Sequence, residues 1–290
     1  MKNLFARPEI KIDIFGDPEA KAMLQRFSNL SYPVFINPNV IKGHATFIPP
    51  EGTTISHKGI ILSIFGEYRD HENRPIKRFF LKKQSLQPEG RFNTVYETDF
   101  TFDSLNFTTA TYYGSSINII FGIDADVIHT FSNTRQESQF ILLSYAPRPH
   151  PVPIHNVIGM KNVLHIEFVF PNSAYDCNDC VPASAFFILV KLRIVQIYIE
   201  IFRFESFCSN VLNFEKKTLI KSYQFLDGPP VRGDYIPIRI FLNDSDIWPH
   251  SAYAGSELKV QHYLRTHIID ENGKSYYKRL KIKIDRYQPE

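Results

Sequence analysis

The chain has 290 residues, of which 43% are hydrophobic and 14% aromatic, and its 33 Lys and Arg against 30 Asp and Glu give a net charge of +3. This near-balance argues against the broad basic surface of a nucleic-acid-binding protein. No apolar run reaches the roughly 20 residues of a transmembrane helix, and charges at Glu9, Lys11 and Asp13 interrupt the start where a secretory signal would be apolar. Three cysteines, an odd number, suit a reducing, cytoplasmic compartment.

Strand patterns dominate the first half of the chain. Ile10, Ile12 and Ile14 alternate with charged residues, as in a half-buried strand. Asp17-Pro18 is typical of a helix start, and a short amphipathic helix reaching Phe27 competes with an irregular loop at this point. Further strands are expected within residues 32–48, 60–64, 79–81, 98–102, 117–127 and 140–143.

A proline-rich segment divides the chain. Residues 145–153, YAPRPHPVP, contain four prolines, and proline lacks the N–H group that a central strand must donate. We expect an extended connector here. The sequence therefore predicts two domains, residues 1–147 and 148–290.

The second half repeats the strand patterns, at residues 164–170, 188–199, 236–242, 260–269 and 280–284. The run 188–199 predicts one long apolar strand whose inward phase switches near Val195, as a β-bulge or a strong twist would cause. Residues 270–273, Asp-Glu-Asn-Gly, predict a hairpin turn. Recurrent turns without long helical periods indicate an all-β fold of two tandem antiparallel β-sandwiches joined by a short hinge.

Phe225 and Leu226 stand directly before a turn at Asp227-Gly228. Adjacent residues of a strand point to opposite faces, so one buried face cannot take both side chains. We expect one of them to meet the core and the other to be available to a partner.

Motifs for catalysis or metal binding are weak. Cys177 and Cys180 have CxxC spacing, but no second pair completes a zinc site, and two loop thiols are the favoured interpretation. Asp124 and Asp126 share one side of a strand, where a solvent-facing or polar-network role is favoured over an acid/base pair. No phosphate-binding loop, dinucleotide fingerprint or nucleophile elbow is present. We expect no enzyme activity, no cofactor and no metal.

Six stretches together resemble the vacuolar protein sorting 26 family, the arrestin-like subunit of retromer. LHIEF and DGPPVRGDYIPIRIFL are the most specific of the matching sequences. The stretches are residues 57–68, 112–127, 162–170, 186–205, 227–242 and 268–278.

The resemblance implies an arrestin-like fold and a non-enzymatic scaffold of endosomal sorting and retrograde transport, cytoplasmic and peripheral on endosomal membranes. The implied partners are a vacuolar protein sorting 35-like α-solenoid subunit, a phox-homology sorting nexin and the cytoplasmic tails of cargo. The alternative is an arrestin-like adaptor of a related, non-retromer cargo-retrieval complex, which would bind a different solenoid.

Two binding sites follow from the resemblance. The solenoid subunit is expected to dock at Phe225, Leu226 and Asp227. Trp248, in the loop that follows, is expected near the same edge, either as an interface anchor or as a cap on the core. The sorting nexin and apolar cargo side chains are expected at an exposed strand edge that includes Ile158 and Tyr277. The family more usually has phenylalanine at the second position, so the hydroxyl of Tyr277 would change the pocket.

Overall fold

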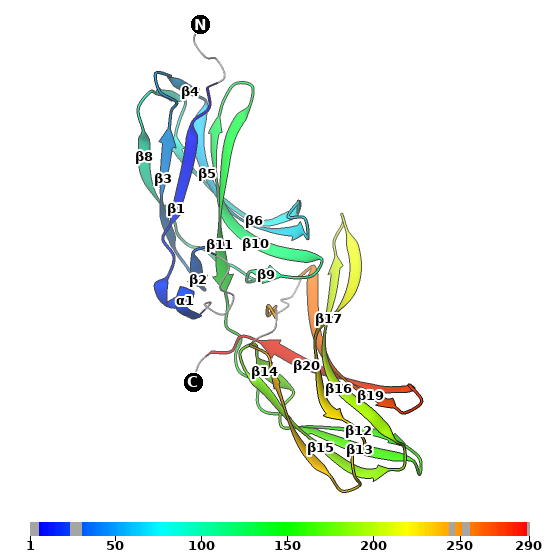
Figure 1. Cartoon of the computed structure of the whole chain (residues 1–290). Coiled ribbons are helices and arrows are strands. Elements are labelled where there is room, and N and C mark those ends of the chain that lie inside the picture. The colour runs from blue at the N-terminus through cyan, green and yellow to red at the C-terminus, as the bar shows by residue number, and fades with distance from the viewer. Residues whose placement is uncertain (1–5, 24–30, 244–246, 251–255, 289–290) are drawn as a thin grey trace. The chain divides into compact units, whose positions relative to one another are not determined.

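The structure is a computed structural model, which describes residues 6–23, 31–243, 247–250 and 256–288. The described chain is almost entirely β-strand with one short helix, so the prediction of an all-β fold is confirmed. The chain divides into two compact units, residues 1–144 and 145–290. This division falls close to the boundary that the proline-rich segment predicts (Figure 1).

The first unit is built from three sheets, two antiparallel and one mixed. β1, β3 and β8 form one, β4 and β7 form a second, and the largest has the order β2-β11-β10-β5-β6, with β9 paired to β10 and β2 parallel to β11. Its elements are β1 (Glu9–Ile14), α1 (Pro18–Met23), β2 (Val34–Ile36), β3 (Ile41–Ile48), β4 (Ile55–His57), β5 (Gly59–Asp70), β6 (Pro75–Gln87), β7 (Gly90–Phe92), β8 (Tyr96–Phe102), β9 (Tyr112–Tyr113), β10 (Ile117–Ile128) and β11 (Asn133–Leu143).

The short helix α1 begins where the sequence predicts it. The Asp17 side chain accepts a hydrogen bond from the Glu19 N–H at 2.9 Å, and the Asp17 carbonyl accepts one from the Lys21 N–H at 3.0 Å. This is N-cap geometry with proline at the first helical position. The helical alternative is therefore the correct one over residues 18–23, and the remainder of its predicted length lies outside the described residues.

Two glycines let aromatic rings lie flat across the central strands of the first unit. Gly66 of β5 pairs with Phe121 of β10, and Gly122 of β10 pairs with Phe65 of β5. A Cβ atom at Gly66 would meet the Phe121 ring at 2.7 Å, and one at Gly122 would meet the Phe65 ring at 2.8 Å. The rings thus occupy the space that side chains at these two positions would need.

The second unit is a sandwich of two sheets. One has the order β12-β13-β15-β18, and the other has the order β14-β20-β19-β16-β17. Buried residues from both sheets form one core, including Ile166, Phe168, Ile199, Ile240 and Leu264. The strands are β12 (Ile154–Met160), β13 (Leu164–Phe170), β14 (Ala174–Asp176), β15 (Cys180–Val190), β16 (Ile194–Cys208), β17 (Asn213–Asp227), β18 (Tyr235–Phe241), β19 (Leu258–Asp270) and β20 (Ser275–Asp285).

The long strand predicted over residues 188–199 is wrong, because the chain leaves one sheet and enters the other within it. β15 ends at Val190 and β16 begins at Ile194, and the two strands belong to different sheets. The Lys191 N–H donates to the Val163 carbonyl, and the Arg193 carbonyl accepts from the Glu271 N–H. The predicted bulge is confirmed, since the pairing of β16 with β19 shifts register between Ile194 and Gln196.

The predicted hairpin between β19 and β20 is also confirmed. Its backbone reverses at Gly273, which has a φ of 74°. The Asp270 side chain accepts hydrogen bonds from the N–H groups of Asn272 and Lys274, each at 2.9 Å. A carboxylate that satisfies two turn amides fixes the register of the hairpin.

No helix in the described part of the chain has the length and apolar character to cross a bilayer.

Candidate functional site

The end of β17 contains a β-bulge at the predicted solenoid-binding residues. Leu226 pairs with Ile197 and Gln224 pairs with the next residue of β16, so Phe225 is the extra residue. Phe225 and Leu226 are both half-buried and both pack against the core, Phe225 through an edge-to-face contact with Phe168 at 6.1 Å. The expectation that only one of them meets the core is wrong, because a bulge interrupts the alternation of strand faces.

Glycines shape the turn that follows. The Gly228 N–H donates to the Val195 carbonyl at 2.7 Å, and the φ of Gly228 is 109°, a value that residues with a side chain rarely adopt. Farther along, the Gly233 N–H donates to the Phe187 carbonyl at 2.7 Å. The Asp234 carboxylate accepts a hydrogen bond from the Val231 N–H at 2.7 Å. These bonds tie residues 228–234 to the ends of β15 and β16.

Exposed apolar side chains surround this turn. Val231 is 67% exposed and Tyr235 is 55% exposed, whereas most large apolar residues of the unit are buried. The rings of Phe186 and Tyr235 lie 4.8 Å apart, and the Tyr235 hydroxyl is 2.9 Å from the Ser184 hydroxyl. We give the name apolar corner to the exposed or half-buried apolar residues of this turn and of the adjoining strand segments: Phe186, Ile188, Val195, Leu226, Val231 and Tyr235.

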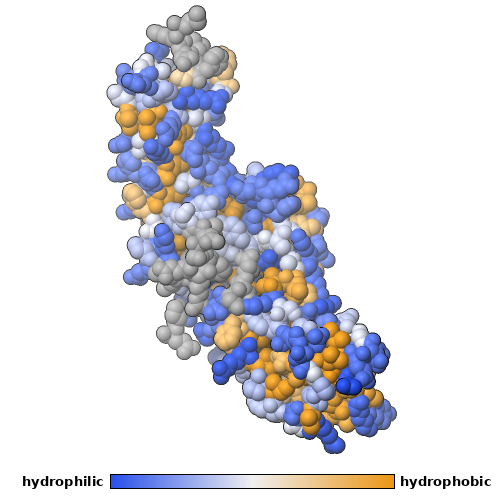
Figure 2. Space-filling model, viewed as in Figure 1, coloured by the Kyte–Doolittle hydropathy of each residue, from blue (hydrophilic) through white to orange (hydrophobic). Residues whose placement is uncertain are grey.

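Sequence reasoning found only Leu226 among the residues of the apolar corner. The run FFILV at 186–190 gave a signal, because a strand with one solvated face should not be apolar at every position. Apolar residues are visible on the second unit in Figure 2, where it occupies the lower part of the view. Exposed apolar side chains near one turn are typical of protein-binding sites.

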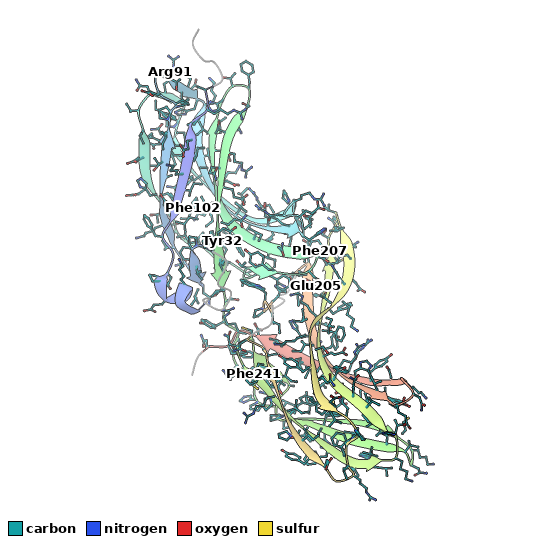
Figure 3. The ribbon with its side chains drawn as sticks, viewed as in Figure 1. Tyr32, Arg91, Phe102, Glu205, Phe207 and Phe241 are labelled. Carbon is teal, nitrogen blue, oxygen red and sulfur yellow. The ribbon has the colours of Figure 1, made fainter. Side chains whose placement is uncertain are left out.

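Trp248 is not joined to this turn. β18 starts at Tyr235, next to the turn, and ends at Phe241, which is labelled in Figure 3. Trp248 follows that far end, beyond Leu242, whose N–H donates to the Asp179 carbonyl at 3.0 Å. Its side chain is only 3% exposed. Burial favours the interpretation of Trp248 as a cap on the core over that of an interface anchor.

The two residues of the predicted nexin and cargo groove lie on strands that meet at one edge of the sandwich. The Lys278 ammonium of β20 donates to the Val157 carbonyl of β12 at 2.8 Å. Ile158 is 8% exposed and belongs to the core, whereas Tyr277 is 59% exposed on the outer face of β20. The structure thus brings their strands together but does not place both side chains in one surface pocket.

Unpaired strand edges are present beside Ile158 and Tyr277. Among the described strands, β12 pairs only with β13. β20 pairs with β14 only at residues 283–285, so the outer edge of residues 275–282 has no described strand beside it. Such an edge can accept an extended peptide as an additional strand.

The candidate thiols and carboxylates do not form a reactive centre. Cys177 is buried, which raises the pKa of its thiol to about 12, and Cys180 is half-buried; both are free thiols. A thiol with so high a pKa is a poor nucleophile and a poor metal ligand. Within residues that the structure describes, no three His, Cys, Asp or Glu side chains cluster as metal ligands would.

Asp124 is a member of a buried polar network, as one of the two favoured interpretations predicts. It is fully buried, and it pairs with Arg135 and, at 3.2 Å, with Arg78. Arg78 also donates to Glu67 at 3.0 Å, and Glu67 accepts from Arg69 at 2.6 Å. Each buried carboxylate in this group is paired with at least two arginines, which identifies a structural network.

The network changes the pKa of two carboxyl groups in opposite directions. Burial by itself would raise the pKa of Glu137, but hydrogen bonds from Arg69 and Gln139 outweigh it and the pKa is lowered. Asp126 behaves differently, because burial raises its pKa more than the nearby Arg135 lowers it. Asp126 also lies beside the charge of Asp124, which raises its pKa further.

Two tandem β units, the second a sandwich of two sheets, define an all-β protein of the arrestin-like class. Residues 8–273 match the family described as vacuolar protein sorting-associated protein 26. The chain belongs to this family, whose members serve in protein transport and trafficking. The match includes Ile158, residues 225–227 and Trp248, and it ends before Tyr277.

Individual relatives agree with this assignment over most of their length. Vacuolar protein sorting-associated protein 26 of Plasmodium falciparum is 25% identical over 282 residues, covering 94% of this chain and 93% of its own. Protein 26B of Arabidopsis thaliana is 28% identical over 263 residues, covering 88% and 85%. The Schizosaccharomyces pombe protein is 22% identical over 260 residues, covering 89% and 87%.

Proposed function

We propose that the chain is the arrestin-like subunit of a retromer-type complex and binds the end of a vacuolar protein sorting 35-like α-solenoid subunit. The apolar corner carries this proposal. It places exposed aliphatic and aromatic side chains around a turn that backbone hydrogen bonds hold in place. An apolar centre with a polar rim is what stable protein interfaces have, and exposed Asp227 belongs to such a rim.

The structure indicates which substitutions test solenoid binding without damaging the fold. Phe225→Asp is a poor choice, because the Phe225 ring packs on Phe168 in the core. Leu226→Asn combined with Asp227→Arg changes the surface with less effect on the core. Glu215→Arg is a matched control, since Glu215 is exposed near the other end of β17.

In a pulldown with the purified solenoid subunit, we expect the double variant to bind about thirtyfold more weakly, as loss of an interface anchor does. Glu215→Arg should bind like the wild type with an unchanged melting curve, and the double variant should melt cooperatively, somewhat below the wild type because Leu226 packs against the core. Full binding by the folded double variant would refute the site. Affinity purification would also show whether the solenoid belongs to retromer or to a related, non-retromer cargo-retrieval complex, the second candidate.

A phox-homology sorting nexin and cargo tails are the further partners that we propose, with peripheral attachment to endosomal membranes through them. The open edge of β20 and the exposed ring of Tyr277 support strand addition by a partner segment. Ile158, a core residue of the neighbouring strand β12, would contribute by packing beneath this binding surface. A cargo peptide with an aromatic residue and a leucine, added together with the nexin, should shift the signal of fluorinated Tyr277. The absence of any shift at saturating nexin would count against this site.

A further inference from the structure

The outer face of the five-stranded sheet in the second unit carries a cluster of cations. Arg265 of β19 and Arg279 of β20 stand directly opposite each other in the strand pairing. Lys217 reaches the same area from β17, the edge strand at the opposite end of the sheet from β20. Phe202 belongs to β16, which lies between β17 and β19. We call Lys217, Arg265, Arg279 and the Phe202 ring the basic platform.

The cations converge on two aromatic rings. The Lys217 ammonium lies 3.9 Å from the centre of the Phe202 ring, and the Arg265 guanidinium lies 4.6 Å from the same centre. Arg265 and Arg279 each lie 5.8 Å from the centre of the Tyr277 ring. The pKa of Lys217 is lowered, first by burial and then by the charges of Arg279 and Arg265. The three positive groups are therefore close enough to repel one another.

Little negative charge compensates this cluster. Glu200 accepts a hydrogen bond from Arg265 at 2.5 Å. Among the ion pairs of the described residues, none includes Lys217, Arg279 or the neighbouring Lys281. Like charges that face each other across a strand pair destabilise a sheet. The cluster therefore reduces stability unless an anion is bound there.

Protection of a sheet edge explains only part of the cluster. Charged side chains on an edge strand disfavour unspecific pairing with other chains, and Arg279 and Lys281 lie on the open part of β20. Arg265, however, is on β19 in the interior of the sheet, and Lys217 is on the opposite edge strand. Neither residue guards the edge of β20.

We propose that Lys217, Arg265 and Arg279 bind a phosphorylated side chain in a segment of a partner protein. A phosphate monoester brings nearly two negative charges and three acceptor oxygens, which suit two arginine forks and one ammonium group. Exposed Tyr277 and Leu219, 59% and 48% exposed, provide apolar surface for the flanking residues of the segment. A phosphorylated segment would replace mutual repulsion with charge-assisted hydrogen bonds.

A peptide fits this site better than an anionic membrane does. Membrane-binding surfaces spread several basic residues over a plane, whereas these cations gather over two neighbouring rings, Phe202 and Tyr277. Glu200 lies in the same row of the sheet as Arg265 and Arg279, and a carboxylate there disfavours a continuous anionic surface. The proposal goes beyond solenoid binding at the apolar corner and does not depend on it.

The test uses the full chain and a fluorescent peptide that carries one phosphoserine, with the unphosphorylated peptide beside it. We expect binding of the phosphorylated peptide only, weakening as salt is added. Arg279→Gln and Lys217→Gln should each weaken binding about tenfold, the effect of losing a hydrogen bond to a charged group. Lys161→Gln is the matched control, because Lys161 is an exposed lysine in the turn between β12 and β13. It should bind like the wild type.

The variants also separate a binding role from a structural one. Arg279→Gln should melt no lower than the wild type while it binds less phosphopeptide. Equal binding of both peptides, or equal weakening by Lys161→Gln, would overturn the proposal. Vesicles of phosphatidylcholine and phosphatidylserine test the other source of phosphate. Vesicle binding that is lost in Arg279→Gln, without phosphopeptide binding, would assign the platform to a membrane and refute a peptide ligand.

Discussion

The two units use charge in different ways. The first unit buries Glu67, Arg69 and Asp124 in a network of opposite charges that joins β5, β6, β10 and β11. The second exposes Lys217 and Arg279 on the outside of a sheet without a described carboxylate partner. Lys and Arg outnumber Asp and Glu in residues 145–290 but not in residues 1–144. In the first unit charge joins strands, and in the second it is available to other molecules.

This difference has an energetic consequence. Removing one member of a buried ion pair leaves an uncompensated charge in a region of low polarity, which is strongly destabilising. Removing an exposed charge changes stability little. The comparison therefore predicts large stability effects in the network and small ones on the basic platform.

The largest effect is expected for Arg69→Met in the first unit. Arg69 joins Glu67 and Glu137, and its side chain is 6% exposed. The substitution should lower the free energy of unfolding by about 4 kcal/mol, because Glu67 would stay buried with one partner fewer. Equilibrium unfolding in urea measures this. Arg91→Met is the control, at an exposed arginine of the same unit that is labelled in Figure 3. Similar losses in both variants would show that the network has no special role.

A buried histidine of the second unit gives the next largest effect. Burial, and secondarily the charge of Arg203, lowers the pKa of His262 from 6.5 to about 3. Its unfolded form therefore binds a proton that the folded form does not, and the associated stability is complete above pH 6.5 and lost as the pH falls toward 3. Between pH 6.5 and roughly pH 4, the wild type should lose about 3 kcal/mol of unfolding free energy through His262, and His262→Leu should not show this loss. Urea unfolding at several pH values measures it. The same dependence of the unfolding free energy on pH in both proteins would contradict the account.

The smallest effect belongs to the basic platform. Arg279→Gln removes one of two arginines that face each other across β19 and β20. The free energy of unfolding should rise by about 0.5 kcal/mol, whereas Lys161→Gln should leave it unchanged. Thermal melting at low salt gives the most sensitive comparison. A clear loss of stability in Arg279→Gln would mean that the cation is structural.

Strand positions could be predicted from alternation wherever one face of a strand is solvated. The residues of β1, β13 and β18 alternate between buried and more exposed positions, and their patterns predicted them directly. The break between β15 and β16 could not be predicted in this way, because the apolar run continues through it while the chain changes sheets. The bulge at Phe225 could not be predicted either. An inserted residue changes which face of the sheet the neighbouring side chains point to, and the sequence carries no signal of the insertion.

Sites assembled from several strands were the least predictable. Leu226 was found because it adjoins a recognisable turn, whereas the sequence left open whether Trp248 is an interface anchor or a cap on the core, because burial depends on the fold around it. The basic platform combines residues of β16, β17, β19 and β20, each of which is unremarkable in its own strand. Only the cross-strand register brings Arg265 opposite Arg279 and both of them close to Lys217.

The central claim is that the apolar corner is the surface that meets the solenoid subunit. Hydrogen–deuterium exchange of the full chain, with and without that subunit, tests it without any substitution. The account predicts slower exchange in peptides that cover residues 223–228 and 231–235, and unchanged exchange in β3 and β8. Unchanged exchange at residues 223–228, with protection confined to the first unit, would contradict it.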